Sequence, residues 1–187
     1  MLRLPNLEAI EALLLDVPAL VDRMDGHDPA FLPALKAWFA AAEDTLRNNR
    51  LAAASEVAAC RAILIAVERG DTDGVAARGS TSARRYREAR ASHLLSRAAG
   101  AVAETIRSRR GQADEAARLM MQLVAAADRL GLIPSDRGRS PSAYLNGIRQ
   151  AISARAELVS HLVHVTGLLG ETDTLIVLDR SIAALRQ

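Results

Sequence analysis

The stretch FLPALKAWFAAAEDTL, residues 31–46, repeats its apolar side chains at spacings of four, three, four and four residues. The residues concerned are Phe31, Leu35, Trp38, Ala42 and Leu46. This spacing places them along one face of an α-helix. Asp28 and Pro29 precede the stretch and are typical of a helix start, with the aspartate as cap and the proline in the first turn. The stretch therefore predicts an amphipathic helix that other helices must cover.

The same helical spacing continues along the rest of the chain. We expect further helices at about 6–26 with a kink or restart at Pro18, and at 51–69, 83–110, 116–130, 140–166 and 172–185. Aromatic residues make up only 3% of the chain, so Leu, Ile, Val and Ala must fill the core. No repeat or linker divides the sequence. It therefore predicts an all-α fold, a single-domain bundle of six or seven helices over residues 1–187 with an Ala-rich core.

Capping and stop signals predict where these helices begin and end. Asn6 suits the cap of the first helix, and Thr172 or Asp173 suits the cap of the last. Gly111 predicts the end of the helix at 83–110, and Gly147 predicts an interruption of the helix at 140–166.

Residues 51–67 contain only two charged side chains, Glu56 and Arg61. On a helical wheel, apolar groups occur on every side of this segment. A helix that is apolar all round is normally buried, so we expect this helix at the centre of the bundle.

The composition favours a globular protein without a membrane span. The net charge is +2, and the longest uncharged, mainly apolar stretch, residues 158–170, has 13 residues, fewer than the ~20 that cross a bilayer. Cys60 is the only cysteine, so no intrachain disulfide can form. Glu8, Glu11 and Asp16 stand where a signal peptide needs an uncharged run. We therefore expect a cytoplasmic protein.

Positive charge is concentrated in residues 78–110, which hold nine arginines and two glutamates. Residues 1–77 hold 7 basic and 12 acidic side chains, and residues 111–187 hold 8 of each. On the expected helix, which would be ~40 Å long at 1.5 Å per residue, the arginines gather near the two ends. We therefore expect any cationic surface to be confined to the ends of this helix and not to run along its whole length.

The amino-terminal end of this segment predicts an anion-binding site. The helix dipole disfavours arginine at a helix start, whereas free backbone N–H groups, hydroxyls and guanidinium forks together suit a phosphate or a carboxylate. The predicted anion- or partner-binding residues are Arg78, Ser80, Thr81, Ser82, Arg84, Arg85, Arg87 and Arg90. The alternative is a solvated face that the acidic first third of the chain balances.

The remaining groups of possible ligand or nucleophile residues in the sequence predict no metal site, cofactor site or catalytic nucleophile. Glu157, His161 and His164 share one helix face at metal-ligand spacing, but this face lies opposite the apolar arc, so we expect it to be an exposed polar face. Residues 71–74 lack the later ligands of a calcium loop. Cys60 lies in the most apolar helix and should be a core side chain.

Arg87 with His93, and Arg155 with His161, have the spacing Arg-x5-His. This spacing resembles the Arg-x4–6-His signature of HEPN-type ribonucleases, which are small all-α dimers that cleave RNA with such a pair. The resemblance covers two residues in each segment and implies a metal-independent nuclease. Six residues of continuous helix rotate by about 240°. Each pair therefore shares a face only if the helix begins between its members or a second subunit contributes.

We expect a non-enzymatic α-helical interaction module, homodimeric or otherwise homo-oligomeric, that binds an acidic or phosphate-bearing partner through the arginines at 78–90. A DNA- or RNA-backbone-binding accessory factor is the first alternative, and a HEPN-like ribonuclease is the second. A third is a structural oligomer in which the arginines pair internally with residues 1–77. The net charge of +2 is too small for bulk attraction to nucleic acid, so any such binding must be local.

Overall fold

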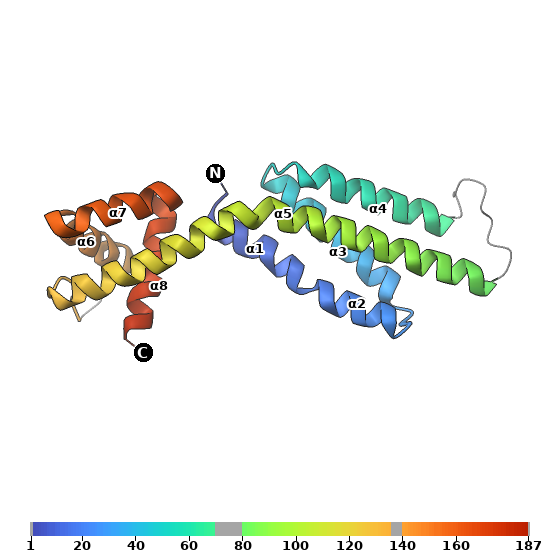
Figure 1. The fold of residues 1–187 in the computed structure, drawn as a ribbon, viewed down its shortest axis with the longest axis horizontal. Coiled ribbons are helices and arrows are strands. Elements are labelled where there is room, and N and C mark those ends of the chain that lie inside the picture. Colours follow the sequence, from blue (N-terminus) through green and yellow to red (C-terminus); the bar gives the residue numbers. More distant parts are fainter. Residues whose placement is uncertain (1, 70–79, 136–139, 187) are drawn as a thin grey trace. The chain divides into compact units, whose positions relative to one another are not determined.

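The computed structural model describes residues 2–69, 80–135 and 140–186, with the backbone alone for residues 80–84. All regular elements in these ranges are α-helices (Figure 1). They are α1 (Leu4–Leu15), α2 (Val17–Asp25), α3 (Phe31–Asn48), α4 (Ala53–Arg69), α5 (Ser80–Arg129), α6 (Pro141–Ser153), α7 (Ala156–Leu169) and α8 (Glu171–Leu185). The predicted all-α class is confirmed.

The helices group into two compact units. The N-terminal unit, Leu4–Ser108 with Leu2, contains α1 to α4 and the first part of α5. The C-terminal unit, Arg109–Gln187 with Arg3, contains the rest of α5 and α6 to α8. Each unit has buried apolar side chains of its own.

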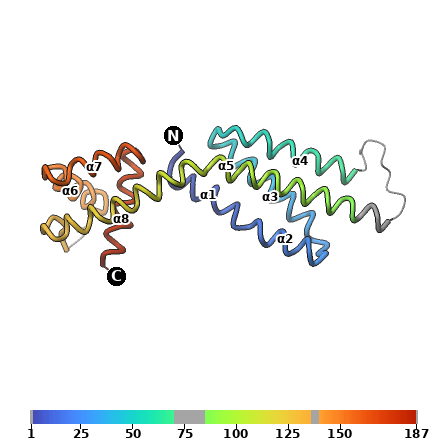
Figure 2. Tube along the Cα trace, viewed as in Figure 1, coloured from blue at the N-terminus to red at the C-terminus, as the bar shows by residue number. Residues whose placement is uncertain are grey.

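The N-terminal unit is an up-and-down arrangement of helical rods. α1 and α2 run end to end, α3 returns beside them, α4 reverses again and α5 comes back (Figures 1 and 2). α3 packs against α1, α2 and α4. All five apolar residues of its predicted stripe are buried, namely Phe31, Leu35, Trp38, Ala42 and Leu46. Burial of each large side chain contributes about 1.5–3 kcal/mol, so this stripe is a main source of the unit's stability.

An ion pair also connects α3 to α4. Glu43 of α3 is buried, and its carboxylate contacts Arg47 of the same helix and Arg61 of α4. The Arg61 Nε lies 2.9 Å from Glu43 Oε2 but away from the hydrogen-bonding direction, so this contact is an ion pair only. A buried carboxylate is costly unless cations surround it. The two guanidinium groups supply that compensation.

The prediction that residues 51–67 form a helix buried on all sides is wrong. Within α4 the buried residues lie on one face, at Ala53, Val57, Cys60, Leu64 and Val67. Alanines on the opposite side are exposed. Because alanine is apolar but has little surface to bury, an alanine-rich helix can have an exposed face that a helical wheel counts as apolar.

The prediction that a helix ends at Gly111 is also wrong, because α5 continues to Arg129. Gly111 is exposed and has no positive φ. Ile106 on one side of it and Ala113 on the other are both buried, and their burial outweighs the ~1 kcal/mol by which glycine weakens a helix. Gly131, with φ +68°, lies just beyond the helix end. No helix in the described ranges is both long and apolar enough to span a membrane.

In the C-terminal unit, Arg109 of α5 caps the end of α7. Its guanidinium donates hydrogen bonds to the carbonyl oxygens of Leu168, at 2.6 Å, and Leu169, at 3.3 Å. It also contacts Asp173 Oδ2 at 3.5 Å, and Asp173 Oδ1 accepts a 2.9 Å hydrogen bond from Arg3. The last carbonyls of a helix have no partner within it. A buried arginine therefore satisfies two of them and pairs with a buried carboxylate.

Three further predicted boundaries differ from the structure. α1 begins at Leu4, so Asn6 lies inside it. The segment 140–166 breaks after Ser153, where Arg155 is extended, and Gly147 stays helical. α8 begins directly after Gly170, so Thr172 and Asp173 lie inside it and neither is its cap; Asp173 is buried against Arg109 instead. By contrast, Ser140 caps α6 as the sequence indicates, since its Oγ accepts the Ala143 N–H at 3.4 Å.

We predict opposite effects of alanine at the two glycines. Gly111→Ala should raise the free energy of unfolding by about 0.5–1 kcal/mol, since the added Cβ meets no atom within 4 Å apart from the neighbouring backbone of its own helix. Gly131→Ala should lower it by about 1 kcal/mol, because its φ of +68° is strained for any side chain. Urea denaturation followed by circular dichroism measures both. Destabilisation by Gly111→Ala would contradict a continuous α5.

Candidate anion-binding site

The structure places the predicted serine and threonine residues inside a helix. The predicted helix start was about residue 83, with Thr81 or Ser82 as cap, but α5 begins at Ser80. Thr81 and Ser82 are therefore in its first turn. The side chains of residues 80–84, which include Arg84, are not described, and Arg78 lies outside the described residues. The prediction for these positions stays a prediction.

Arg85 and Arg90 are exposed on the first turns of α5. Among the residues whose side chains the structure describes, neither has an ion-pair or hydrogen-bond partner. Arg87 is half-buried and already interacts with another group of the protein. Two guanidinium groups near the start of α5 thus face water, where they can meet an external anion.

The other arginines of the basic segment behave differently, because they pair within the protein. Arg97 donates a 3.0 Å hydrogen bond to Glu56 of α4, and this bond raises the pKa of Arg97. Arg107 contacts Glu104, and Arg110 lies 3.1 Å from Asp114, both along α5. Arg109 is buried against Asp173. Internal pairing therefore accounts for the carboxy-terminal arginines, whereas Arg85 and Arg90 remain available.

A pocket of about 370 Å³ lies beside Arg87, between the start of α5 and the connection from α2 to α3. Its lining consists of His27, Asp28, Pro29, Phe31, Leu32, Arg87 and Glu88. The lining combines apolar side chains with charged groups of both signs. His27 Nδ1 lies 3.5 Å from Glu88 Oε2, so a protonated His27 forms an ion pair across the pocket.

His27 has an unusual backbone conformation. Its φ is +53°, in the left-handed region that glycine adopts most easily. The His27 N–H donates to Met24 O at 3.0 Å and the Asp28 N–H donates to Arg23 O at 2.9 Å, which together close the end of α2. A side chain other than glycine costs about 1–2 kcal/mol in this conformation. Strained residues of this kind gather at functional sites, and His27 lies in the wall of a pocket.

Sequence reasoning missed the contribution of residues 27–32 to this site. They are about sixty positions from Arg87 along the chain, and their proximity follows from the return of α5 beside the α2–α3 connection. The Asp28-Pro29 pair predicted the helix start about two residues too early, because α3 begins at Phe31 with Ala30 at the cap position. Asp28 Oδ1 accepts the Ala30 N–H at 2.8 Å in the turn just ahead of α3. No sequence signal indicated that this turn would border a pocket.

The histidines of α7 lie on an exposed face, as predicted. Glu157, His161 and His164 are all exposed, and His164 Nε2 lies 3.9 Å from Glu115 Oε1 of α5. Within the described ranges no three His, Cys, Asp or Glu side chains are grouped closely enough to hold a metal ion. The calcium-like residues 71–74 lie outside those ranges.

The two Arg-x5-His pairs differ in geometry. Arg87 and His93 both belong to the continuous helix α5, so they point about 120° apart around its axis and share no face. Arg155 stands at the cap position of α7 in an extended conformation, so this helix begins between Arg155 and His161. Both of these side chains are exposed.

Cys60 is fully buried on the inner face of α4. Burial raises the pKa of its thiol, and Glu56 adds to this effect, whereas the charge of Arg97 opposes it. The thiol is therefore neutral at physiological pH and acts as a small core side chain, as predicted.

Iodoacetamide should alkylate Cys60 at least about 100-fold more slowly in the native protein than in denaturant, because the reagent must wait for an opening of the fold. Mass spectrometry of quenched samples measures both rates. Equal rates would show that the α4 face around Cys60 is open to solvent.

Comparisons of the chain with protein-family models, with curated proteins and with solved structures found no match.

Proposed function

We propose that the protein is a non-enzymatic, homo-oligomeric helical interaction module that binds an acidic or phosphate-bearing partner through the start of α5. The observation that carries this proposal is the contrast between the arginines of residues 85–110 on α5. Arg97, Arg107, Arg109 and Arg110 have carboxylate partners, whereas Arg85 and Arg90 are exposed and, within the described residues, have none. Arg78, Ser80, Thr81, Ser82 and Arg84 are the neighbouring residues that would extend the site.

An acidic protein segment is a better partner than a nucleic-acid backbone. The pocket beside Arg87 has an apolar wall of Pro29, Phe31 and Leu32, which can accept an apolar side chain of a partner protein. Glu88 and Asp28 in the same pocket would repel any anion placed inside it, so the pocket itself suits the apolar side chain and the anions must bind outside it. Arg85 and Arg90 would hold carboxylates on either side of the apolar anchor. This combination of charge and apolar contact is typical of protein recognition.

The proposal predicts binding of a fluorescein-labelled, glutamate-rich peptide that contains one leucine. The double variant Arg85→Gln/Arg90→Gln should weaken this binding at least about 10-fold, because each charge-assisted hydrogen bond contributes roughly 1.5–3 kcal/mol. Fluorescence anisotropy at low ionic strength measures the affinity. The matched control is Arg97→Gln/Arg107→Gln, which removes the same charge from internally paired positions of the same helix and should change the affinity by less than about twofold.

Labelled duplex DNA of mixed sequence serves as the second probe. If DNA binds, depends on Arg85 and Arg90, and loses affinity steeply with salt, while the peptide does not bind, then the partner carries phosphate and the accessory-factor alternative replaces the proposal. If neither probe binds at low ionic strength, the anion-binding role is wrong.

A ribonuclease that uses Arg155 and His161 is the second candidate, because α7 begins between them and this is the condition under which such a pair can share a face. We expect the protein to leave a labelled single-stranded RNA intact in the presence of EDTA. Cleavage that persists in His93→Ala and disappears in His161→Ala would establish the nuclease instead.

A further inference from the structure

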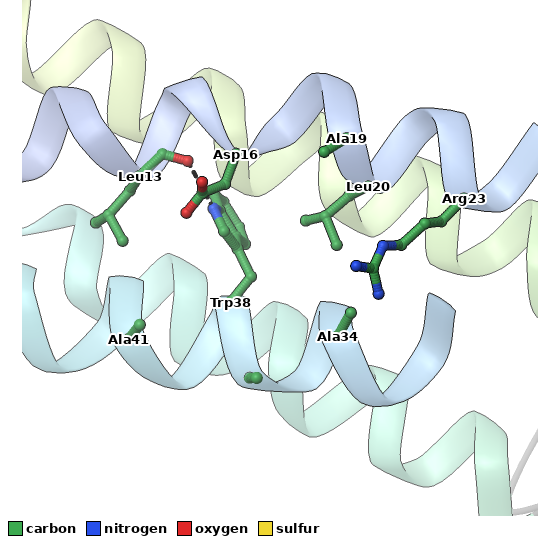
Figure 3. A pocket seen from close by; sticks show the side chains of 9 residues that line it. Leu13, Asp16, Ala19, Leu20, Arg23, Ala34, Trp38 and Ala41 are labelled. Carbon is green, nitrogen blue, oxygen red and sulfur yellow. Dashed lines mark hydrogen bonds between the residues drawn. The ribbon is translucent and has the colours of Figure 1, made fainter. Parts of the chain in front are cut away.

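A groove in the N-terminal unit lies between the α1–α2 rod and α3, away from the arginine site. Its volume is about 400 Å³, and its lining residues are Leu13, Asp16, Ala19, Leu20, Arg23, Ala34, Ala37, Trp38 and Ala41. Figure 3 shows these side chains on the two facing sides of the groove. The Trp38 indole N–H donates a 2.7 Å hydrogen bond to Leu13 O, so the ring is held against α1.

Small side chains keep the groove open. Ala34, Ala37 and Ala41 of α3 line one side of the groove, and Ala19 of α2 belongs to the other side. The methyl groups are too short to meet across the space, whereas Leu20 and Trp38 close its floor. The groove is therefore apolar inside and shallow enough for the side chains of an incoming helix.

Two charged residues of opposite sign stand on the α1–α2 side of the groove. Asp16 and Arg23 are both exposed, and neither has a side-chain partner among the residues that the structure describes. They are seven positions apart, so they lie on one face of the rod about 10 Å apart along its axis. Figure 3 shows both projecting from this rod, with Leu20 between them.

The most exposed large apolar side chain of the protein's described part, Leu15, adjoins this face with 78% of its surface accessible. Ala12, Leu15 and Ala19 follow one another at spacings of three and four residues and are all exposed. This spacing forms an apolar stripe of the kind that packs against another helix. An exposed leucine beside an alanine-lined groove indicates a contact surface that the single chain leaves uncovered.

We infer that a second copy of this chain occupies this surface, with α2 packed antiparallel to α2 of the other copy about a two-fold axis. In that arrangement Asp16 of each copy meets Arg23 of the other, and the axis passes between positions 19 and 20. A surface with one acid and one base on a single helix face is complementary to itself only when the second helix runs in the opposite direction. Two copies then neutralise all four charges, and the alanines let the helices approach closely.

This inference rests on the homo-oligomeric part of the proposed function and locates the interface. Its test is a charge reversal followed by analytical ultracentrifugation of the full-length protein. Asp16→Arg alone and Arg23→Asp alone should each weaken the dimer at least about 10-fold, because each places two pairs of like charges across the axis. The double variant Asp16→Arg/Arg23→Asp should restore it.

Mixing gives a sharper result, because it separates the interface from any effect on folding. The Asp16→Arg protein carries two arginines at these positions and the Arg23→Asp protein carries two aspartates. Each should be monomeric alone, and the equimolar mixture should form a one-to-one dimer. Asp25→Arg, on the opposite side of α2, is the control and should leave the wild-type dimer unchanged.

A wild-type protein that sediments as a monomer over the micromolar range would overturn the inference. If the wild-type protein is an oligomer and none of these variants changes its oligomeric state, the proposed interface is wrong, although the protein is still homo-oligomeric. The charge-reversed monomers should still bind the glutamate-rich peptide, since the arginine site lies on α5. This result would separate the dimer interface from the anion-binding site. The double variant Arg85→Gln/Arg90→Gln should correspondingly lose the peptide but keep the dimer.

Discussion

Burial of the apolar stripe of α3 is the interaction on which the N-terminal unit depends. α3 contacts α1, α2 and α4, so the sizes of its side chains determine how closely each neighbour approaches. Leu35 and Phe39 are completely buried in the interior. On the side that faces α2, α3 carries Ala34, Ala37 and Ala41, and the groove remains open there. A single helix thus supplies both the core of the unit and one side of the groove.

Electrostatic pairing divides the basic segment into two functional parts. An arginine with a carboxylate one turn away, or on the facing helix, is already neutralised and contributes to the fold. Glu104 and Asp114 do this for their neighbours on α5, and Glu56 does it from α4. The first turns of α5 receive less such compensation, since Glu88 is shared with His27. The geometry of the carboxylates, more than the number of arginines, therefore defines the candidate site.

The sequence predicted those features that depend on large apolar side chains. The stripes of α3 and α5 could be recognised because leucine, isoleucine and phenylalanine must be buried wherever they recur at helical spacing. Alanine and glycine gave weaker signals. The alanines on the exposed side of α4 did not show which side of that helix is buried, and Gly111 did not end a helix whose neighbouring residues are held by packing. Arg109 could not be distinguished from surface arginines because its role depends on carbonyl groups about sixty residues away. The pocket beside Arg87 depends on a similarly distant turn.

The backbone conformation at His27 lowers the stability of the fold, whereas the side chain at this position makes a contact that glycine could not make. Glycine would relieve the left-handed strain there, so a chain selected for stability alone would gain by losing the imidazole. The same replacement would remove the side chain that reaches Glu88. Among related sequences, a histidine retained at this turn would therefore mark a position that selection preserves for what the imidazole contacts, Glu88 included, at a cost in the stability of the turn.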